Sequence, residues 1–291
     1  MVRRLAVVGV GLIGGSLARA LREAGEVGEV VGCGRGRENL ERGVALGVID
    51  RWTHSVAEAV DGADLVFVAV PLGAMRGAFA AMRDHLAPDA VVTDGGSAKA
   101  SVVTDARAAL GARIASFVPG HPIAGTERTG VEASFAALYR NRRVILTPLS
   151  ETAPAATQRV EAMWRACGAE VTTMSVEHHD EVLAATSHLP HMLAFGLVDA
   201  LARLKENDEI FRYAAGGFRD FTRIASSSPV MWRDICVANR DALSRMLERF
   251  AEEMNDLADT IRRGDGDHLL EIFGRAKAAR DRYVDGMRGE E

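Results

Sequence analysis

The stretch that decides the fold is LAVVGVGLIGGSLARAL, residues 5–21. An apolar run leads directly into three glycines with GxGxxG spacing, and a helical pattern follows at once. In such a unit the first glycine makes a tight turn, the second lets phosphates approach the backbone, and the third lets the helix pack on the strand. The free N–H groups at the start of the helix favour bound phosphate. We therefore predict a dinucleotide site that includes Gly9, Gly11, Leu12, Ile13 and Gly14.

Short apolar runs continue to alternate with helical stretches after this unit, as EVVGC, DLVFVAV, AVVTDGG, IASFVPG, RVILTP and a last strand near 169–174. Strand–helix alternation predicts a parallel sheet covered on both faces. We expect an α/β domain with a Rossmann-type doubly wound sheet over residues 1–174. Long helical patterns over 176–206, 229–263 and 266–287 then predict an all-α C-terminal domain, residues 175–291.

Two of these helical stretches are unusually apolar. The segment LPHMLAFGLVDALARL, residues 189–204, is apolar nearly all round, which predicts burial on several sides. Its Pro190 predicts a kink near His188 and His191. Apolar side chains also recur at spacings of three and four, as a seam that fits either an internal core or a subunit contact, at Leu243, Met246, Phe250, Met254, Leu257 and Ile261.

Composition argues against several classes of protein. The net charge is −5 without a lysine–arginine block, which argues against a nucleic-acid binder, and no apolar run reaches membrane-spanning length. Three cysteines lie far apart without a CxxC, so we expect a reducing, cytoplasmic setting. The histidine-rich stretch EHHDEVLAATSHLPH, residues 177–191, does not converge at helical spacing, so we expect no metal site.

The second predicted strand ends in GCGRGR, residues 32–37. An NAD-binding unit usually places an acid there for the ribose 2′-hydroxyl, but this chain has Gly34. Two guanidiniums, Arg35 and Arg37, follow and could pair with a 2′-phosphate. Alternatively, they are simply solvated. The pattern leans toward NADP, or toward tolerance of both NADP and NAD.

The other unusual residues also come just after predicted strands, where ligands bind in open α/β sheets. They are Val70 and Pro71, then Ser97, and then His121 in the stretch PGHPIAGTERTG, residues 119–130. A stretch so rich in glycine and proline normally marks a surface loop with a solvated histidine. Its position beyond a strand and the rigid Gly–His–Pro frame instead favour His121 as a general base. Ser97 could then hydrogen-bond His121 and hold its tautomer.

Six motifs occur in a characteristic order: GVGLIGGS, VAVP, DGGSAK, GHPIAG, TSHLPH and FTRIASSSPVMWRDI. Together they resemble the TyrA family of prephenate and arogenate dehydrogenases over most of the chain. The resemblance implies NAD- or NADP-dependent oxidative decarboxylation in tyrosine biosynthesis, of prephenate to 4-hydroxyphenylpyruvate or of arogenate to tyrosine. It also implies a homodimer formed through the helical domain.

The same resemblance assigns roles to individual residues. It implies that His121 takes the proton of the ring hydroxyl as hydride leaves C4, and that Ser97 orients this histidine. It implies that His191 lies in the substrate pocket and Arg223 binds a substrate carboxylate, with Gly216 and Trp232 nearby. GCGRGR departs from the family's common acid. Two other readings stay open: a 3-hydroxyacid-type dehydrogenase without decarboxylation, and a non-catalytic NAD(P)-binding sensor.

Overall fold

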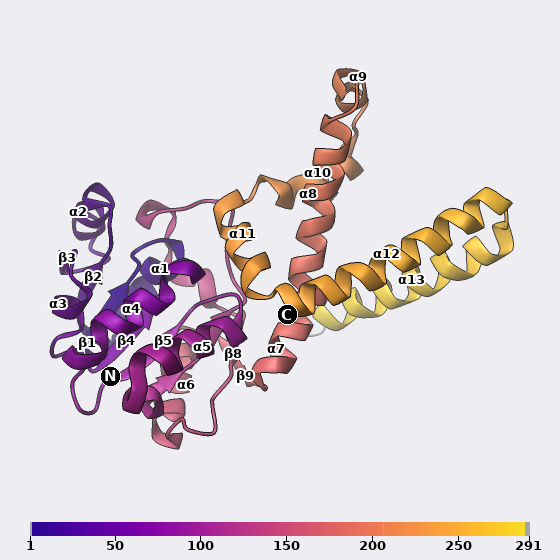
Figure 1. Ribbon diagram of the computed structural model, residues 1–291. Helices are drawn as coiled ribbons and strands as arrows, with labels where there is room; N and C mark the ends of the chain where they lie inside the picture. Colours follow the sequence, from indigo (N-terminus) through magenta and orange to yellow (C-terminus); the bar gives the residue numbers. More distant parts are fainter. Residues whose placement is uncertain (1, 206, 289–291) are drawn as a thin grey trace. The chain divides into compact units, whose positions relative to one another are not determined.

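The computed structural model describes residues 2–205 and 207–288 (Figure 1). Its centre is a six-stranded parallel sheet in the order β3-β2-β1-β4-β5-β6, which is the doubly wound order. The Rossmann-type prediction is therefore confirmed. The strands are β1 Val2–Val8, β2 Val27–Cys33, β3 Arg51–Thr53, β4 Leu65–Val68, β5 Val91–Asp94 and β6 Phe117–Val118.

The strands are apolar on both faces because both faces are covered. Leu5 and Val7 of β1 point into one core, and Ala6 and Val8 point into the other. Helices α1 (Leu12–Glu23), α2 (Arg37–Ala45) and α6 (Pro154–Ala166) contribute to the first core. Helices α3 (Val56–Val60), α4 (Met75–Met82) and α5 (Lys99–Leu110) contribute to the second core.

Three strands form a second sheet, which the alternating pattern does not predict. They are β7 (Gly120–Pro122), β8 (Arg143–Leu146) and β9 (Glu170–Thr173), with β7 antiparallel to β8. Pro119 has no N–H for a further ladder bond, and β6 ends just before it. The chain then pairs His121 with Ile145 of β8. His121 therefore lies on a buried strand, whereas residues 123–130 after it have no helix or strand and are mostly exposed.

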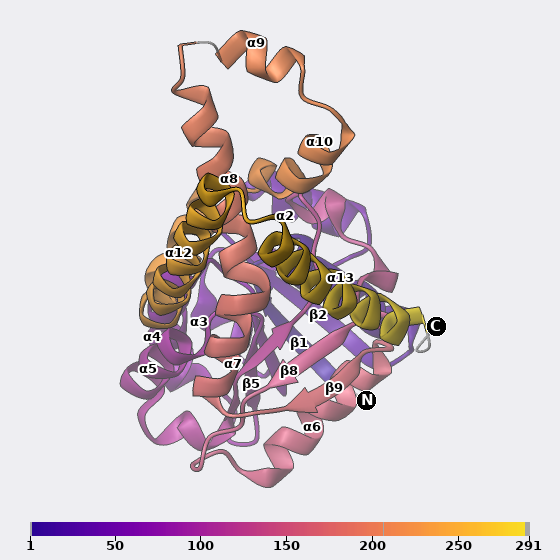
Figure 2. The ribbon, with the colours of Figure 1, turned by 90° about the vertical axis from the view of Figure 1, so that its right-hand side faces the viewer.

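The helical pattern begins after Ser175, as expected, but its helices are more broken than predicted. Pro190 is accommodated by a π-helical turn, η6 (Ala184–His188), which joins α7 (Val176–Leu183) to α8 (Leu189–Ala202). The chain continues through α9 (Asn207–Arg212) and returns through α10 (Gly216–Thr222), as Figures 1 and 2 both show. The helix expected over 229–263 is interrupted at Asn239, between α11 (Pro229–Ala238) and α12 (Arg240–Arg263).

Short 3₁₀ segments complete the described fold: η1 Leu72–Ala74, η2 Arg83–His85, η3 Gly111–Ser116, η4 Val131–Ala133, η5 Ala136–Tyr139 and η7 Arg223–Ser226. Contacts divide the chain into two compact units, Met1–Leu243 and Ser244–Glu291. The first unit includes helices up to α11, because α7 packs on α5 and α11 packs on η1. The domain boundary at 174/175 therefore stays a prediction.

The later helices leave apolar side chains uncovered. Helix α8 buries only Leu189 and Ala194, so the expected burial on several sides is absent in this single chain. In the second unit, which holds most of α12 and α13 (Gly266–Arg288), only Thr260 is buried between residues 244 and 285. Within the described residues, no helix is both long enough and apolar enough to cross a membrane.

Candidate active site

The glycine-rich turn after β1 has the geometry of a phosphate cradle. Gly9 has a φ of +104°, and a Cβ on it would lie 2.3 Å from the carbonyl oxygen of Ala69. A Cβ on Gly14 would lie 2.2 Å from the carbonyl oxygen of Gly9. These two glycines are therefore required by the close packing of the turn. A Cβ on Gly11, in contrast, would meet no atom within 4 Å, so the backbone there is open to a ligand.

The N-terminus of α1 is also suited to an anion. Gly11 gives this terminus no side-chain cap, and the first turn, which includes Leu12 and Ile13, carries no acid. Its N–H groups and the positive end of its dipole therefore favour phosphate. The turn is held from outside, since the Tyr139 hydroxyl donates to the carbonyl of Ile13 at 2.6 Å. These residues fit the pyrophosphate of a dinucleotide.

Asn39 ties this turn to the segment that follows His121. Its amide nitrogen donates to the carbonyl of Val10 at 2.6 Å, and its amide oxygen accepts from the N–H of Val131 at 2.9 Å. Val70 borders the turn just after β4, since a Cβ on Gly9 would lie 3.1 Å from its nitrogen, and Pro71 follows it in the chain. The phosphate turn, the end of β4 and the chain after β7 therefore lie together.

The ribose end of the predicted cofactor site is exposed and rich in arginine. A Cβ on Gly34 would lie 3.5 Å from Leu40, an ordinary contact, so neither space nor φ requires glycine there. Arg35 is exposed. Arg37 pairs with Glu41 at 2.8 Å and lies over the ring of Trp52, with its side chain 74% exposed. The two arginines remain available at the surface, although Arg37 already has a partner.

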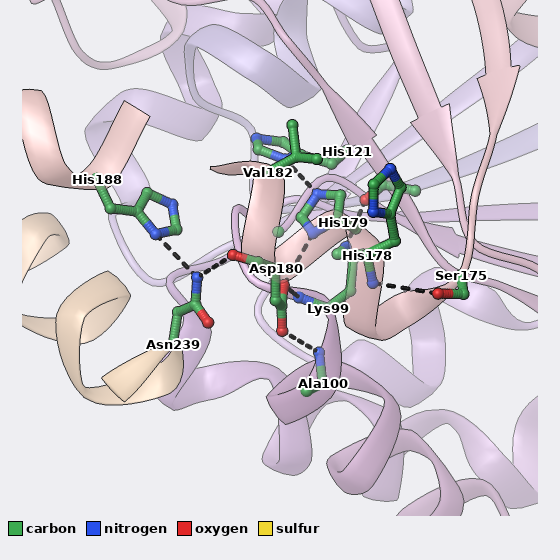
Figure 3. A network of polar contacts seen from close by, with 12 residues as sticks. Lys99, Ala100, His121, Ser175, His178, His179, Asp180, Val182, His188 and Asn239 are labelled. Atoms are coloured by element: carbon green, nitrogen blue, oxygen red, sulfur yellow. Dashed lines mark hydrogen bonds and ion pairs between the residues drawn. The ribbon is translucent and has the colours of Figure 1, made fainter. Parts of the chain in front are cut away.

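Hydrogen bonds link three side chains in series, from Asp180 through His179 to His121. Its Nδ1 lies 2.9 Å from Nε2 of His179, and Nδ1 of His179 lies 2.8 Å from a carboxylate oxygen of Asp180 (Figure 3). His121 comes from β7, whereas His179 and Asp180 come from α7, whose first turn is capped by the hydroxyl of Ser175. All three side chains are buried.

The hydrogen bonds in this series determine where the protons are. A carboxylate can only accept, so Nδ1 of His179 carries the proton and its Nε2 accepts. Nδ1 of His121 must therefore donate to His179. The neutral imidazole of His121 then has its free lone pair on Nε2, which is the atom a general base needs.

Burial keeps His121 in this neutral form. It lowers the pKa of His121 well below 6.5, and the nearby charges of His179, Lys99 and His188 act in the same direction. Burial also lowers the pKa of His179, against the effect of Asp180. Both imidazoles are therefore neutral near neutral pH, and Nε2 of His121 can accept a proton.

Ser97 does not hold His121 in this structure. It lies half-buried after β5, and no hydrogen bond between the two side chains occurs within the described residues. His179 already occupies Nδ1 of His121, which is the position that an orienting partner needs. His179 therefore fixes the tautomer of His121 in this structure. The role of Ser97 toward His121 or the substrate stays a prediction.

The predicted substrate-binding residues lie on neighbouring helices. His191 stacks on Trp232, with ring centroids 3.7 Å apart, and its Nδ1 donates to the carbonyl of Ser187 at 2.8 Å. Burial lowers the pKa of His191, and the charge of Arg223 acts in the same direction. Segment η7, which begins at Arg223, packs on α8, which carries His191. Arg223 is exposed and has no ion-pair partner within residues 2–205 and 207–288. Gly216 begins α10, which packs on α8 and η7.

Sequence reasoning did not identify the residues that support these histidines. Asn239, at the break between α11 and α12, donates from one amide nitrogen to the carbonyl of Asp180 and to Nδ1 of His188. Burial lowers the pKa of His188 to about 4. The adjacent histidine and aspartate at 179–180, just past the last strand, were a usable signal. Within the described part of the chain, no cluster of histidine, cysteine and acidic side chains is arranged to hold a metal ion.

Known proteins match this chain over nearly its whole length. Residues 17–173 match the family model for the nucleotide-binding domain of prephenate dehydrogenase, and residues 175–275 match the model for its dimerization domain. The chain is 40% identical over 280 residues to the cyclohexadienyl dehydrogenase of Zymomonas mobilis, covering 96% of this chain and 95% of that protein.

Two solved structures are similar to this fold. Prephenate dehydrogenase from Aquifex aeolicus, in complex with hydroxyphenyl propionate and NAD+, gives a TM-score of 0.91 at 38% identity, covering 97% of this chain and 98% of that chain. Arogenate dehydrogenase from Synechocystis gives a TM-score of 0.81 at 27% identity, covering 96% of this chain and 99% of that chain.

Proposed function

The chain belongs to the prephenate dehydrogenase family, and on this premise we propose that it oxidatively decarboxylates prephenate, arogenate or both, with NAD or NADP, in tyrosine biosynthesis. The observation that carries the proposal is the series of hydrogen bonds from Asp180 through His179 to His121. This series leaves a free lone pair on Nε2 of His121, a buried histidine beyond the carboxyl end of β6. That is where the reacting part of a bound dinucleotide is expected.

The residues account for each proton in the reaction. A bound nicotinamide supplies the hydride acceptor. As C4 of the substrate ring loses hydride, Nε2 of His121 takes the hydroxyl proton and C4 becomes a carbonyl. Loss of CO₂ from C1 sends its bonding pair into the ring, and the C4 oxygen becomes a phenolate. His121 then returns the proton to that oxygen, so the enzyme ends in its starting protonation state.

The substrate carries its hydroxyl and its ring carboxylate on opposite carbons, so base and cation must lie apart. His188 and His191 both lie against Trp232, with ring centroids 6.0 Å and 3.7 Å from that of the indole, and η7, which begins at Arg223, packs on α8. We propose that the ring lies between His121 and these helices, with Arg223 on a carboxylate and with Trp232, Gly216 and Ser97 beside it.

For the cofactor we propose a preference for NADP. The packing at Gly34 does not require glycine, and glycine brings no carboxylate that would repel a 2′-phosphate. Arg35 is free to pair with that phosphate, and the exposed Arg37–Glu41 pair is weak enough to rearrange. NAD use is retained if the ribose hydroxyls are bound through the backbone.

We also infer that a second copy of the chain covers the apolar helical faces. The support is the exposure of α8 and of the predicted seam, where Met254 is 45% and Ile261 is 59% exposed, in a region that matches a dimerization-domain family. Sedimentation should give twice the mass of the 291-residue chain. A monomer at micromolar concentration contradicts this inference.

The three free cysteines are consistent with the expected cytoplasmic setting.

The activity is tested by incubating the protein with prephenate or arogenate and with NAD or NADP. We expect one CO₂ released for each nicotinamide reduced. Reduction of NAD(P) by a simple 3-hydroxyacid, with no CO₂ from prephenate or arogenate, would support the 3-hydroxyacid-type alternative. Dinucleotide binding without turnover of any of these substrates would support the sensor.

A further inference from the structure

Lys99 is a charged residue buried completely in the first unit, with 0% of its side chain exposed. Its ammonium contacts two oxygens, a carboxylate oxygen of Asp94 at 2.5 Å and the carbonyl oxygen of Gly120 at 2.5 Å. Burial lowers the pKa of Lys99, and Asp94 opposes this effect. A buried ion pair is a poor source of stability compared with apolar packing. Its position suggests a different role.

The first role concerns the backbone that carries His121. Asp94 accepts from the N–H of Gly120 at 3.0 Å, while Lys99 donates to the carbonyl of the same residue. The two side chains thus hold both the N–H and the carbonyl group of Gly120. The carbonyl of Gly120 belongs to the peptide group that includes the nitrogen of His121. The ion pair therefore fixes the position from which the imidazole extends.

The second role concerns the imidazole itself. The backbone N–H of Lys99 donates to Asp180 at 2.8 Å, and the N–H of Ala100 donates to the other oxygen of Asp180 at 2.9 Å (Figure 3). Asp180 in turn holds His179, which accepts from His121. Lys99 is therefore connected to His121 by two routes, one through the backbone of β7 and one through α7.

We propose that Lys99 is the positioning residue of His121 for proton transfer: its ammonium fixes the backbone at Gly120 and His121, while its backbone N–H helps to hold Asp180 and, through it, His179. This inference rests on the proposed function, because it takes His121 to be the base. Lys99 need not touch the substrate for this role. Since a misplacement of about 1 Å can cost about 10²-fold in rate, its loss should affect turnover more than binding.

Lys99 should also leave a signature in the pH dependence. The titratable groups that face His121 are Asp94 from β5, Lys99 from α5, His179 and Asp180 from α7, and His188 from η6. Burial is the main cause of the low pKa of His121, and the charge of Lys99 adds to it. Removing the ammonium should therefore raise this pKa, and the acid limb of the pH–rate profile should move to higher pH.

The test compares Lys99→Met with the double variant Lys99→Met/Asp94→Asn, which leaves no unpaired buried carboxylate. We expect kcat to fall at least tenfold, the KM values for substrate and dinucleotide to stay within about twofold, and the acid limb to move up. Ser101→Ala is the matched control. Its hydroxyl lies on the same helix and has no hydrogen-bond partner, so the variant should retain the parent kcat and pH profile.

A measurement on the unmodified enzyme covers the case in which neither variant folds. Nitrogen NMR of ¹⁵N-histidine-labelled protein, with His121 assigned by its loss in His121→Asn, should show a proton on Nδ1 and no titration near pH 6.5. Titration at 6.5, or a folded Lys99→Met with the parent kcat and profile, overturns the inference. If His121→Asn also keeps normal turnover, the proposed function fails instead, so the two failures are distinguishable.

Discussion

The surroundings of His121 and those of Gly34 lie beyond strands of the same parallel sheet, yet they are built differently. Around His121, the charged residues Asp94, Lys99 and Asp180 are buried and hydrogen-bonded to one another and to the backbone. Around Gly34, Arg35 is exposed, and Arg37 has one exposed partner. The first region is fixed by its interactions, whereas the second can rearrange at little cost.

The difference lies in the effective dielectric constant. A buried charge keeps a strong field and is costly to leave unpaired, so each group in the His121 network restricts the others. An exposed ion pair contributes about 0–1 kcal/mol and is screened by salt. Substitutions should therefore have large, specific effects in the network and small, salt-dependent effects at the arginines.

The largest effect is expected for His121→Asn. It removes the lone pair that accepts the hydroxyl proton, so kcat should fall by roughly 10²–10⁴, the range general-base catalysis contributes. Because the pKa of His121 is lowered, the parent enzyme should keep its rate as the pH falls to 6.5 and lose it only as the pH falls further, toward the lowered pKa. Steady-state kinetics between pH 5 and 9 measure both.

His178→Asn, which replaces an exposed histidine on α7 next to His179, is the control for this variant and should leave kcat unchanged. If His121→Asn turns over normally, the buried network serves folding alone, and its contrast with the exposed region has no catalytic meaning.

An intermediate effect is expected for Arg223→Ala. The guanidinium is exposed but should become enclosed by substrate, so it belongs between the two extremes. Loss of a bidentate carboxylate contact should raise KM at least about tenfold, which is about 1.4 kcal/mol. Arg203→Ala, which removes another exposed arginine of the helical part, is the control. An unchanged KM with a reduced kcat would contradict the carboxylate role.

The smallest effect is expected at Gly34. The parent enzyme should show a higher kcat/KM with NADP than with NAD, and Gly34→Asp should reverse this preference by repelling a 2′-phosphate and accepting from the ribose hydroxyls. Gly34→Asn has the same size without the charge and should produce a weaker change. Raising the salt concentration should narrow the difference between the cofactors. A clear preference of the parent for NAD would show that both arginines point into solvent.

Local patterns predicted the parts of the fold that depend on neighbours in sequence. The roles of Gly9 and Gly14 follow from one strand, one turn and one helix, and the close contacts in the structure agree with them. Strand β7 has only three residues and pairs with β8 across a long segment, so no periodicity marks it. The break at Asn239 was equally hidden, because the helical pattern over 229–263 runs across it.

The candidate site was predicted in outline, since the histidine and arginine came from short motifs. What sequence did not supply is the partner of each side chain. Spacing within α7 carries no information about His121, which reaches His179 from another element. Lys99 was visible within DGGSAK, yet only its complete burial between Asp94 and Gly120 indicates a role.

The two hydrogen bonds of the Asn39 side chain have a consequence for how this enzyme can change over evolution. The segment after β7 is anchored at Ile123, whose N–H donates to Arg143, and again at Val131 by Asn39. Neither anchor uses a side chain from the residues between them, where Arg128 and its neighbours are largely exposed. Doubling the length of such a loop costs only about 0.6 kcal/mol. This segment can therefore accept insertions and exchanges while His121 and the phosphate turn keep their places.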